Sequence, residues 1–195
     1  MFELRDHDYL YRIMAIDNGS SFLGLVILDM DLRTGVYEIL HTVTYDAVKM
    51  LDVHKQSLFS HSPRWARQCT LQDQIRDDLE YWSPDAVVVE GFFFMPGRVT
   101  SFETLTEMMV FLRQAVQEYS GHDLYRVSPG EAKKAVQSGK FTMKKVVIPD
   151  CIRALDNLRP RPHIDLNSLT EHEYDAIAVG VAHGERIRRD TGFVR

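Results

Sequence analysis

The sequence has few of the residues that mark several common classes of protein. Its two cysteines, Cys69 and Cys151, belong to no CxxC motif and no Cys/His cluster, so we expect both to be packing residues rather than zinc ligands or disulfide partners. No apolar run approaches the roughly 20 residues that a membrane-spanning helix needs. The opening segment, MFELRDHDYLYR, is charged where a secretory signal would be apolar. We therefore expect a cytoplasmic protein with no membrane partner.

Positive charge is also in short supply. The 23 Lys and Arg residues are outnumbered by 28 Asp and Glu residues, which gives a formal net charge of -5. This balance argues mildly against nucleic-acid binding, because phosphate contacts need positive charge, although a local basic cluster would override it. With 195 residues, 45% of them hydrophobic, and no internal repeat, residues 1–195 are expected to form one domain around a single core.

The pattern of apolar residues predicts an α/β protein. Three strands, in YRIMAID, FLGLVILDM and VYEILHTVTY, are expected to form an antiparallel meander. The next elements are a helix over about 62–82, the buried strand AVVVE, a helix over about 100–119 and the strand DLYRVS. After them we expect a helix from Ser128 and a helix in MKKVVIPDCIRAL that is kinked by Pro149. A loop over about 157–169 then leads to a final helix in EHEYDAIAVGVAHGERIRR. The result is a mixed five-stranded sheet with helices on both faces, which is the element order of ribonuclease H-like folds.

Three of these apolar segments each carry one acid. Asp17 ends the first strand, Glu90 ends AVVVE, and Asp175 lies near the start of the last helix. A buried carboxylate needs hydrogen bonds, a cation or a shifted pKa, so its presence favours a functional role. If AVVVE runs parallel beside a central first strand, Glu90 comes close to Asp17. His172 precedes Asp175 by three residues and shares its helix face, so four potential metal ligands converge.

Each of these residues also has a structural interpretation. Asp17 can accept turn hydrogen bonds from the residues after it, Glu90 can cap a loop, and Asp175 can interact favourably with the helix macrodipole. His172 can be a solvated residue at a helix start. It is less plausible that the three acids have three unrelated structural roles than that they form one site. For His172, both interpretations stay open.

Four segments resemble, in order and at suitable spacing, the signature blocks of the RuvC-type Holliday junction resolvases. These segments are IMAIDNGSSFLGLVIL, VVVEGFFF, SPGEAKKAVQSGKFTMKKVV and EYDAIAVGVAH, and together they span nearly the whole chain. The resemblance implies that Asp17, Glu90 and Asp175 are metal-binding acids, with His172 at a fourth position that is usually an acid in the family. It also implies a homodimeric ribonuclease H-like nuclease that cuts four-way DNA junctions.

The chemistry of phosphodiester hydrolysis agrees with such a set of ligands. The reaction needs an activated water, neutralised charge at phosphorus and help for the departing oxygen, and two metal ions about 4 Å apart supply all three. We expect two ions per site, with Asp17 contacting both, Glu90 holding one, and Asp175 and His172 holding the other. Oxygen ligands favour Mg²⁺, and the nitrogen of His172 makes Mn²⁺ an acceptable substitute.

Basic and aromatic residues predict a DNA-binding surface. Five lysines gather in one short stretch: Lys133, Lys134, Lys140, Lys144 and Lys145. We expect the last three to contact phosphates and the first two to form a solvated helix face. The resemblance implies that Lys144 is a catalytic lysine near the scissile phosphate. It also implies that Phe93 lies beside the junction centre, where stacking stabilises unpaired bases.

Several alternatives remain at this point. The apolar positions of the helix over about 100–119 fit either a two-fold dimer interface or a wholly intramolecular core. Within nucleases, an enzyme for other branched DNA or for RNA is the main rival. A catalytically silent nucleic-acid-binding relative is disfavoured by the intact acids. An actin-like nucleotide-binding domain is disfavoured because a second glycine-rich phosphate loop is not evident.

Overall fold

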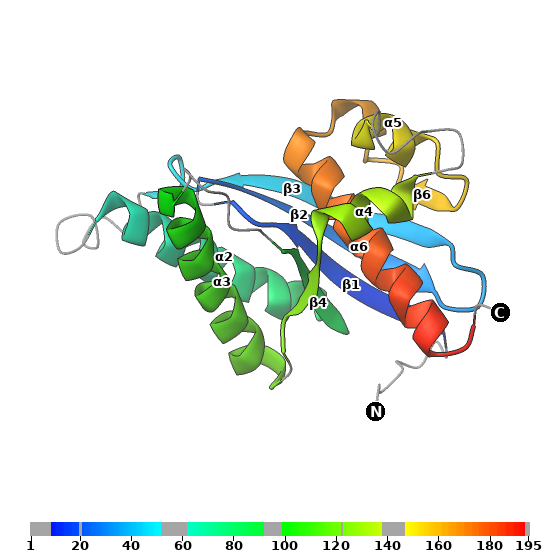
Figure 1. The fold of residues 1–195 in the computed structure, drawn as a ribbon, viewed down its shortest axis with the longest axis horizontal. Helices are drawn as coiled ribbons and strands as arrows, with labels where there is room; N and C mark the ends of the chain where they lie inside the picture. The colour runs from blue at the N-terminus through cyan, green and yellow to red at the C-terminus, as the bar shows by residue number, and fades with distance from the viewer. Residues whose placement is uncertain are drawn as a thin grey trace.

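The computed structural model describes residues 9–19, 21–51, 62–91, 99–121, 123–137 and 147–193 (Figure 1). Its elements are β1 (Leu10–Asp17), β2 (Phe22–Asp31), β3 (Tyr37–Asp46), α2 (Pro63–Trp82), β4 (Ala86–Glu90), α3 (Val99–Ser120), β5 (Tyr125–Val127), α4 (Pro129–Val136), α5 (Ile148–Arg153), β6 (Leu158–Pro160), the 3-10 helix η3 (Leu166–Ser168) and α6 (Glu171–Asp190). None of the described helices combines the length and apolar character that crossing a membrane requires.

The strands form one mixed sheet in the order β5-β4-β1-β2-β3-β6. β1 pairs with β2 and β2 with β3 in antiparallel fashion, while β4 runs parallel to β1, so the predicted meander and the parallel neighbour are both confirmed. The predicted number of five strands is wrong by one. The additional strand, β6, pairs parallel with the start of β3 inside the segment predicted as a loop. Three residues that include a proline give too short a pattern to be recognised as an edge strand.

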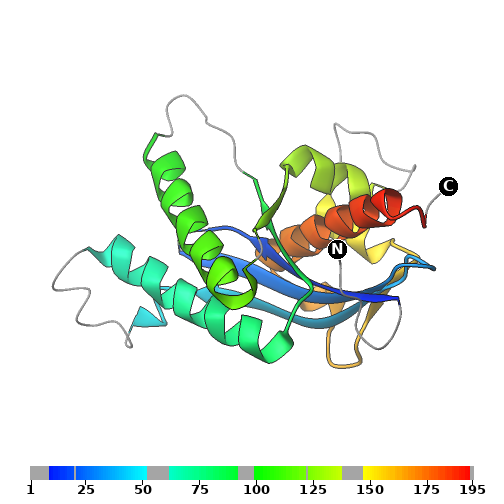
Figure 2. The same cartoon turned by 90° about the horizontal axis from the view of Figure 1, so that it is seen from below.

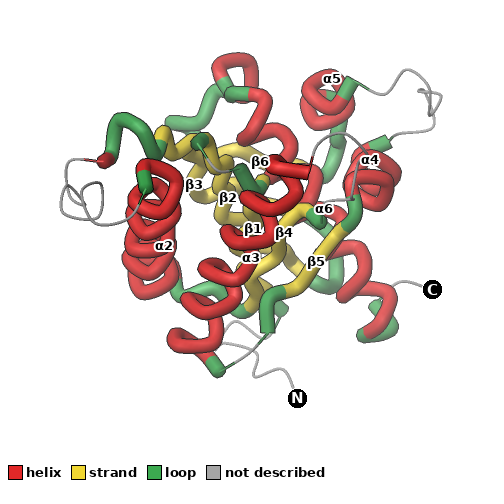
Figure 3. Tube along the Cα trace, turned by 60° about the vertical axis from the view of Figure 1, so that its left-hand side comes forward, coloured by secondary structure: helices red, strands yellow, loops and turns green. Residues whose placement is uncertain are grey.

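Helices cover both faces of the sheet, as Figures 2 and 3 show. Alternate residues of β1 point to opposite faces, so Ile13 and Ala15 join the apolar cluster under α4, α5 and α6, whereas Met14 and Ile16 join the cluster under α2 and α3. Because β1 is buried on both faces, it reads as a continuous apolar run. A carboxylate at its end is therefore held by a rigid central element.

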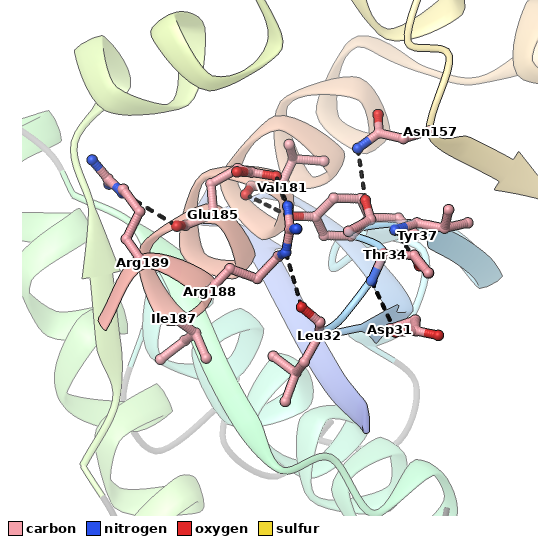
Figure 4. A network of polar contacts seen from close by, with 12 residues as sticks. Asp31, Leu32, Thr34, Tyr37, Asn157, Val181, Glu185, Ile187, Arg188 and Arg189 are labelled. Atoms are coloured by element: carbon pink, nitrogen blue, oxygen red, sulfur yellow. Dashed lines mark hydrogen bonds and ion pairs between the residues drawn. The ribbon is translucent and has the colours of Figure 1, made fainter. Parts of the chain in front are cut away.

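Helix α6 lies close against the sheet because glycines face it. A Cβ at Gly180 would come within 2.5 Å of Leu28 Cδ1 and 3.1 Å of Ala15 Cβ, and one at Gly184 within 2.6 Å of Tyr37 Oη. Polar contacts fix the same half of the helix (Figure 4). Tyr37 Oη donates to the carbonyl of Val181 at 3.3 Å, and Arg188 Nε donates to the carbonyl of Leu32 at 3.1 Å. These contacts set the rotation and position of α6 and so aim its first turn.

One prediction about the helices needs correction, and one open alternative is decided for a residue of α3. Pro149 does not kink a helix; it lies in the first turn of α5, where its missing N–H is not needed, and residues 143–146 lie outside the described part of the chain. Leu112 of α3 is fully buried in the cluster against the sheet, so it belongs to the intramolecular core rather than to a dimer surface. On the same helix, the side chain of Val110 is 63% exposed.

Candidate active site

The sheet topology brings the first two acids together. β1 and β4 are parallel neighbours with Ile16 paired to Val89, so Asp17 and Glu90 leave the sheet side by side at its carboxyl edge. The pKa of Glu90 is raised partly by the charge of Asp17, as expected of two neighbouring carboxylates. Both side chains are largely buried. The predicted proximity of these two acids is thus present in the structure.

The first turn of α6 delivers the other two predicted residues. Its start is fixed by a capping box between Thr170 and Glu173, and Thr170 Oγ1 lies 2.5 Å from Thr44 Oγ1 of β3. His172 Nδ1 lies 2.6 Å from Asp17 Oδ2. Asp175 follows on the same helix face, close enough for the charge of Asp17 to raise its pKa. The structure therefore gathers Asp17, Glu90, His172 and Asp175 in one region.

Gly24 makes this approach of α6 possible. It pairs with Asp17 across the β1–β2 ladder, and the backbone of His172 lies directly over it. A Cβ at Gly24 would come within 2.5 Å of the His172 carbonyl carbon and 2.9 Å of the His172 Cβ. Any side chain here would push the first turn of α6 off the sheet.

Phe22 stacks on the imidazole ring of His172. The rings of Phe22 and His172 are stacked, with centroids 5.9 Å apart and planes 16° from parallel, and Phe22 remains 45% exposed. Sequence reasoning missed both Phe22 and Gly24. Their contribution depends on where α6 docks, and no local pattern in β2 reports that.

Burial and crowding of like charge shift the acids together. Burial, then the charges of Asp17 and Asp175, raise the pKa of Glu90 to about 7. Burial, then Asp17 and Glu171, raise the pKa of Asp175 to about 6. Burial also raises the pKa of Asp17, although the hydrogen bond and charge of His172 oppose that rise. The charges of the three carboxylates therefore affect one another, and the nearby positive charge is too small to cancel their repulsion.

Lys133 on α4 supplies part of that positive charge. Its ammonium group lowers the pKa of both Glu90 and Asp175, so it acts on the site although the side chain is exposed to solvent. Lys133 is exposed to solvent, as predicted for a solvated helix face, and its charge reaches the acids from that position. The lysine cluster was visible in the sequence, but the direction in which α4 presents it was not.

The donor set suits a hard divalent cation, although a cage is not preformed. Within the described ranges, no three His, Cys, Asp or Glu side chains stand close enough to enclose a metal ion. Three partly buried carboxylates of raised pKa are nevertheless the ligands that Mg²⁺ or Mn²⁺ prefers, and a cation would relieve their mutual repulsion. Beside Asp17, both polar atoms of the Asn18 amide are buried and have no hydrogen-bond partner among the described residues, and a bound ion or water is one explanation for such an amide.

The remaining predicted site residues cannot be placed. Phe93, Lys140, Lys144 and Lys145 all lie outside the described residues. Their predicted contacts with DNA, and the catalytic role implied for Lys144, stay predictions.

Comparison with solved structures identifies the architecture. RuvC of Thermus thermophilus in complex with a Holliday junction substrate superposes with a TM-score of 0.66 and 20% sequence identity, over 93% of this chain and 97% of that one. The chain has the fold of a RuvC-type resolvase. The Fowlpox virus resolvase in complex with substrate Holliday junction DNA matches with a TM-score of 0.54 and 16% identity, over 89% of this chain and 99% of that one. No family model and no curated protein sequence matches, so the RuvC-type likeness lies in the fold.

The first prediction concerns the pH dependence of stability without divalent metal. The pKa of Glu90 is about 7 in the folded protein, against an ordinary value of 4.5. Between pH 4.5 and 7, Glu90 is therefore protonated in the folded state and ionised in the unfolded state. The contribution of Glu90 to stability is then fully present below about pH 4.5 and is lost as pH rises through 7. Glu90→Gln should raise stability in chelator at pH 8 by on the order of 2 kcal/mol and have little effect at pH 5. Urea unfolding at both pH values measures this, with the exposed Glu80→Gln as control. A Glu90→Gln variant no more stable than the parent at pH 8 would contradict the crowding of charge.

The second prediction concerns Gly24. Gly24→Ala should destabilise the fold by about 1–3 kcal/mol through overpacking against the backbone of His172, and should shift the NMR signals of the His172 imidazole. Gly130→Ala is the matched control, because a Cβ there meets nothing within 4 Å. Unchanged His172 signals in a folded Gly24→Ala protein would show that Gly24 does not position α6.

Proposed function

We propose that this protein is a metal-dependent endonuclease that cuts four-way DNA junctions, with residues 1–195 as its nuclease domain. The observation that carries the proposal is the meeting of Asp17, Glu90 and Asp175, from β1, β4 and α6, at the carboxyl edge of the sheet. The fold likeness supports the choice of substrate, since two of the similar proteins, one bacterial and one viral, are seen bound to Holliday junction DNA.

Each residue of the candidate site would have its own role in phosphodiester hydrolysis. Asp17, Glu90, Asp175 and His172 are the residues that would hold two divalent cations. Bound there, the cations would supply an activated water, neutralise the phosphate charge and assist the departing oxygen. The Nδ1 contact of His172 fixes the orientation of the Asp17 carboxylate. Lys133 offers positive charge where a phosphate would meet three acids, which reduces the repulsion between site and DNA. The oxygen of water would form a bond to phosphorus as the bond from phosphorus to O3′ breaks, and O3′ would take up a proton, which leaves the 5′-phosphate and 3′-hydroxyl of a ligatable nick.

The proposed enzyme acts as a homodimer through the outer face of α3. Val110 is 63% exposed on that helix, and the neighbouring Trp65 is 42% exposed while packing edge-on against Phe111 with ring centroids 5.1 Å apart. Exposed apolar side chains on a long helix suit a two-fold contact between copies. Two sites related by such an axis would nick two like strands at symmetric positions.

The third prediction tests the chemistry. Asp17→Asn, Glu90→Gln and Asp175→Asn should each lower cleavage of a four-way junction by at least about 100-fold in Mg²⁺, because each removes a ligand charge. Lys133→Ala should slow cleavage by about 10-fold or more. Junction binding should survive in all four variants. The assay compares junction, flap, duplex and RNA–DNA hybrid. If the parent protein cuts flaps or hybrids faster than four-way junctions, the proposed substrate is wrong. Full activity in any acid variant would remove that acid from the site.

The fourth prediction tests the dimer. Val110→Glu should leave the circular dichroism spectrum unchanged but convert dimer to monomer in light scattering, because it places charge at an exposed apolar position. Paired nicks should then give way to single nicks. Val147→Glu makes the same substitution at an exposed apolar position outside α3 and serves as a control for charge alone. A parent protein that is monomeric yet makes paired nicks would rule out this interface.

A further inference from the structure

A groove between α4 and α6 forms a cavity of about 440 Å³ outside the site described above. Its floor is made of the small apolar side chains of Val127, Ala135 and Ala182. Its rim carries three cations, Lys134, Arg186 and Arg189, of which Lys134 and Arg189 are exposed to solvent. The two helices lie side by side in Figures 1 and 2.

The acids in this groove already have partners within the protein. Glu131 accepts hydrogen bonds from the backbone and hydroxyl of Ser128, as the capping residue of α4. Glu185 accepts a hydrogen bond from Tyr37 and pairs with Arg188. The negative charge of the groove is therefore engaged in holding the fold. Three cations, Lys134, Arg186 and Arg189, face these two acids, so the groove keeps an excess of positive charge that can attract an anion from outside.

Arg186 and Arg189 differ in how much they are engaged. Arg186 contacts the carbonyl of Arg126 and the imidazole of His183, so it contributes to holding α6 in place. Arg189 donates its Nε to the carbonyl of Glu185, and its charge also acts on Glu131, while its side chain stays exposed to solvent. Lys134 and Arg189 are therefore the groove residues whose charge is best suited to an external partner.

The groove and the candidate site share helices α4 and α6. Lys133, whose charge acts on Glu90 and Asp175, precedes Lys134 on the same helix. The other flank of the molecule has the opposite character, since Asp77, Asp78 and Glu80 gather around a shallow depression on α2. DNA phosphates would be attracted to the α4–α6 side and repelled from the α2 side.

We propose that the α4–α6 groove binds the phosphate backbone of one duplex arm of the DNA substrate, with Lys134 and Arg189 as the contacting residues. This inference rests on the proposed nuclease function and extends it to a second contact far from the cut. At a rise of about 1.5 Å per residue, Arg186 and Arg189 lie roughly 16 and 21 Å along α6 from Asp175. A duplex that follows the helix would meet them about five to six base pairs from the scissile phosphate.

The test measures junction binding by fluorescence anisotropy in the Asp17→Asn background, between 50 and 200 mM NaCl. The double variant Lys134→Gln/Arg189→Gln should weaken binding by about 10-fold at 100 mM NaCl and reduce the slope of log K against log[salt] by about 2, one for each lost phosphate contact. The charge-preserving Lys134→Arg/Arg189→Lys should match the parent. Arg161→Gln, which removes one exposed cation elsewhere on the surface, should leave the slope within about 0.3 of the parent.

Neutral methylphosphonates locate the contact without changing the protein. The methylphosphonates are placed five and six base pairs from the crossover, in one arm at a time. They should weaken binding of the parent when they lie in the arms that occupy the groove and not in the other arms. They should not weaken binding of the double variant further. Equal affinity and slope in parent and double variant, or no effect of methylphosphonates in any arm, would overturn the groove contact while junction cleavage by the parent remains. A parent that neither binds nor cuts junctions would instead overturn the proposed function.

Discussion

The candidate site depends on the docking of the first turn of α6 over the end of β1 and the start of β2. Gly24 leaves room for the backbone of His172, and the imidazole then lies 2.6 Å from the Asp17 carboxylate. The other half of the helix is locked by Gly180, Gly184 and the Tyr37 contacts, so the first turn has little freedom to move. Residues separated by more than 150 positions in the chain are thereby held together.

This docking has an electrostatic cost that indicates a function. Three acids share a largely buried region in which their charges raise one another's pKa, and Lys133 with His172 offsets only part of that repulsion. A fold selected for stability alone would place apolar or neutral residues at these positions. A divalent cation is the partner that would turn this repulsion into binding energy.

The sequence predicted the proximity of the three acids better than it predicted the residues around them. Asp17, Glu90 and Asp175 were recognisable because each acid interrupts a strongly apolar segment, and the parallel placement of AVVVE followed from the same pattern. β6 escaped prediction because three residues carry no periodicity. Phe22, Gly24 and Lys133 escaped because their contribution is set by tertiary packing, which neighbouring residues in the chain do not encode.

Calorimetric titration of metal-depleted protein with Mn²⁺ tests most directly whether the acids form one metal site. We predict saturable binding of two ions per protomer in the parent and the loss of at least one of them in Asp17→Asn, with both proteins folded. Identical isotherms for parent and Asp17→Asn, or no saturable binding in a folded parent, would contradict a metal site built on Asp17, Glu90 and Asp175.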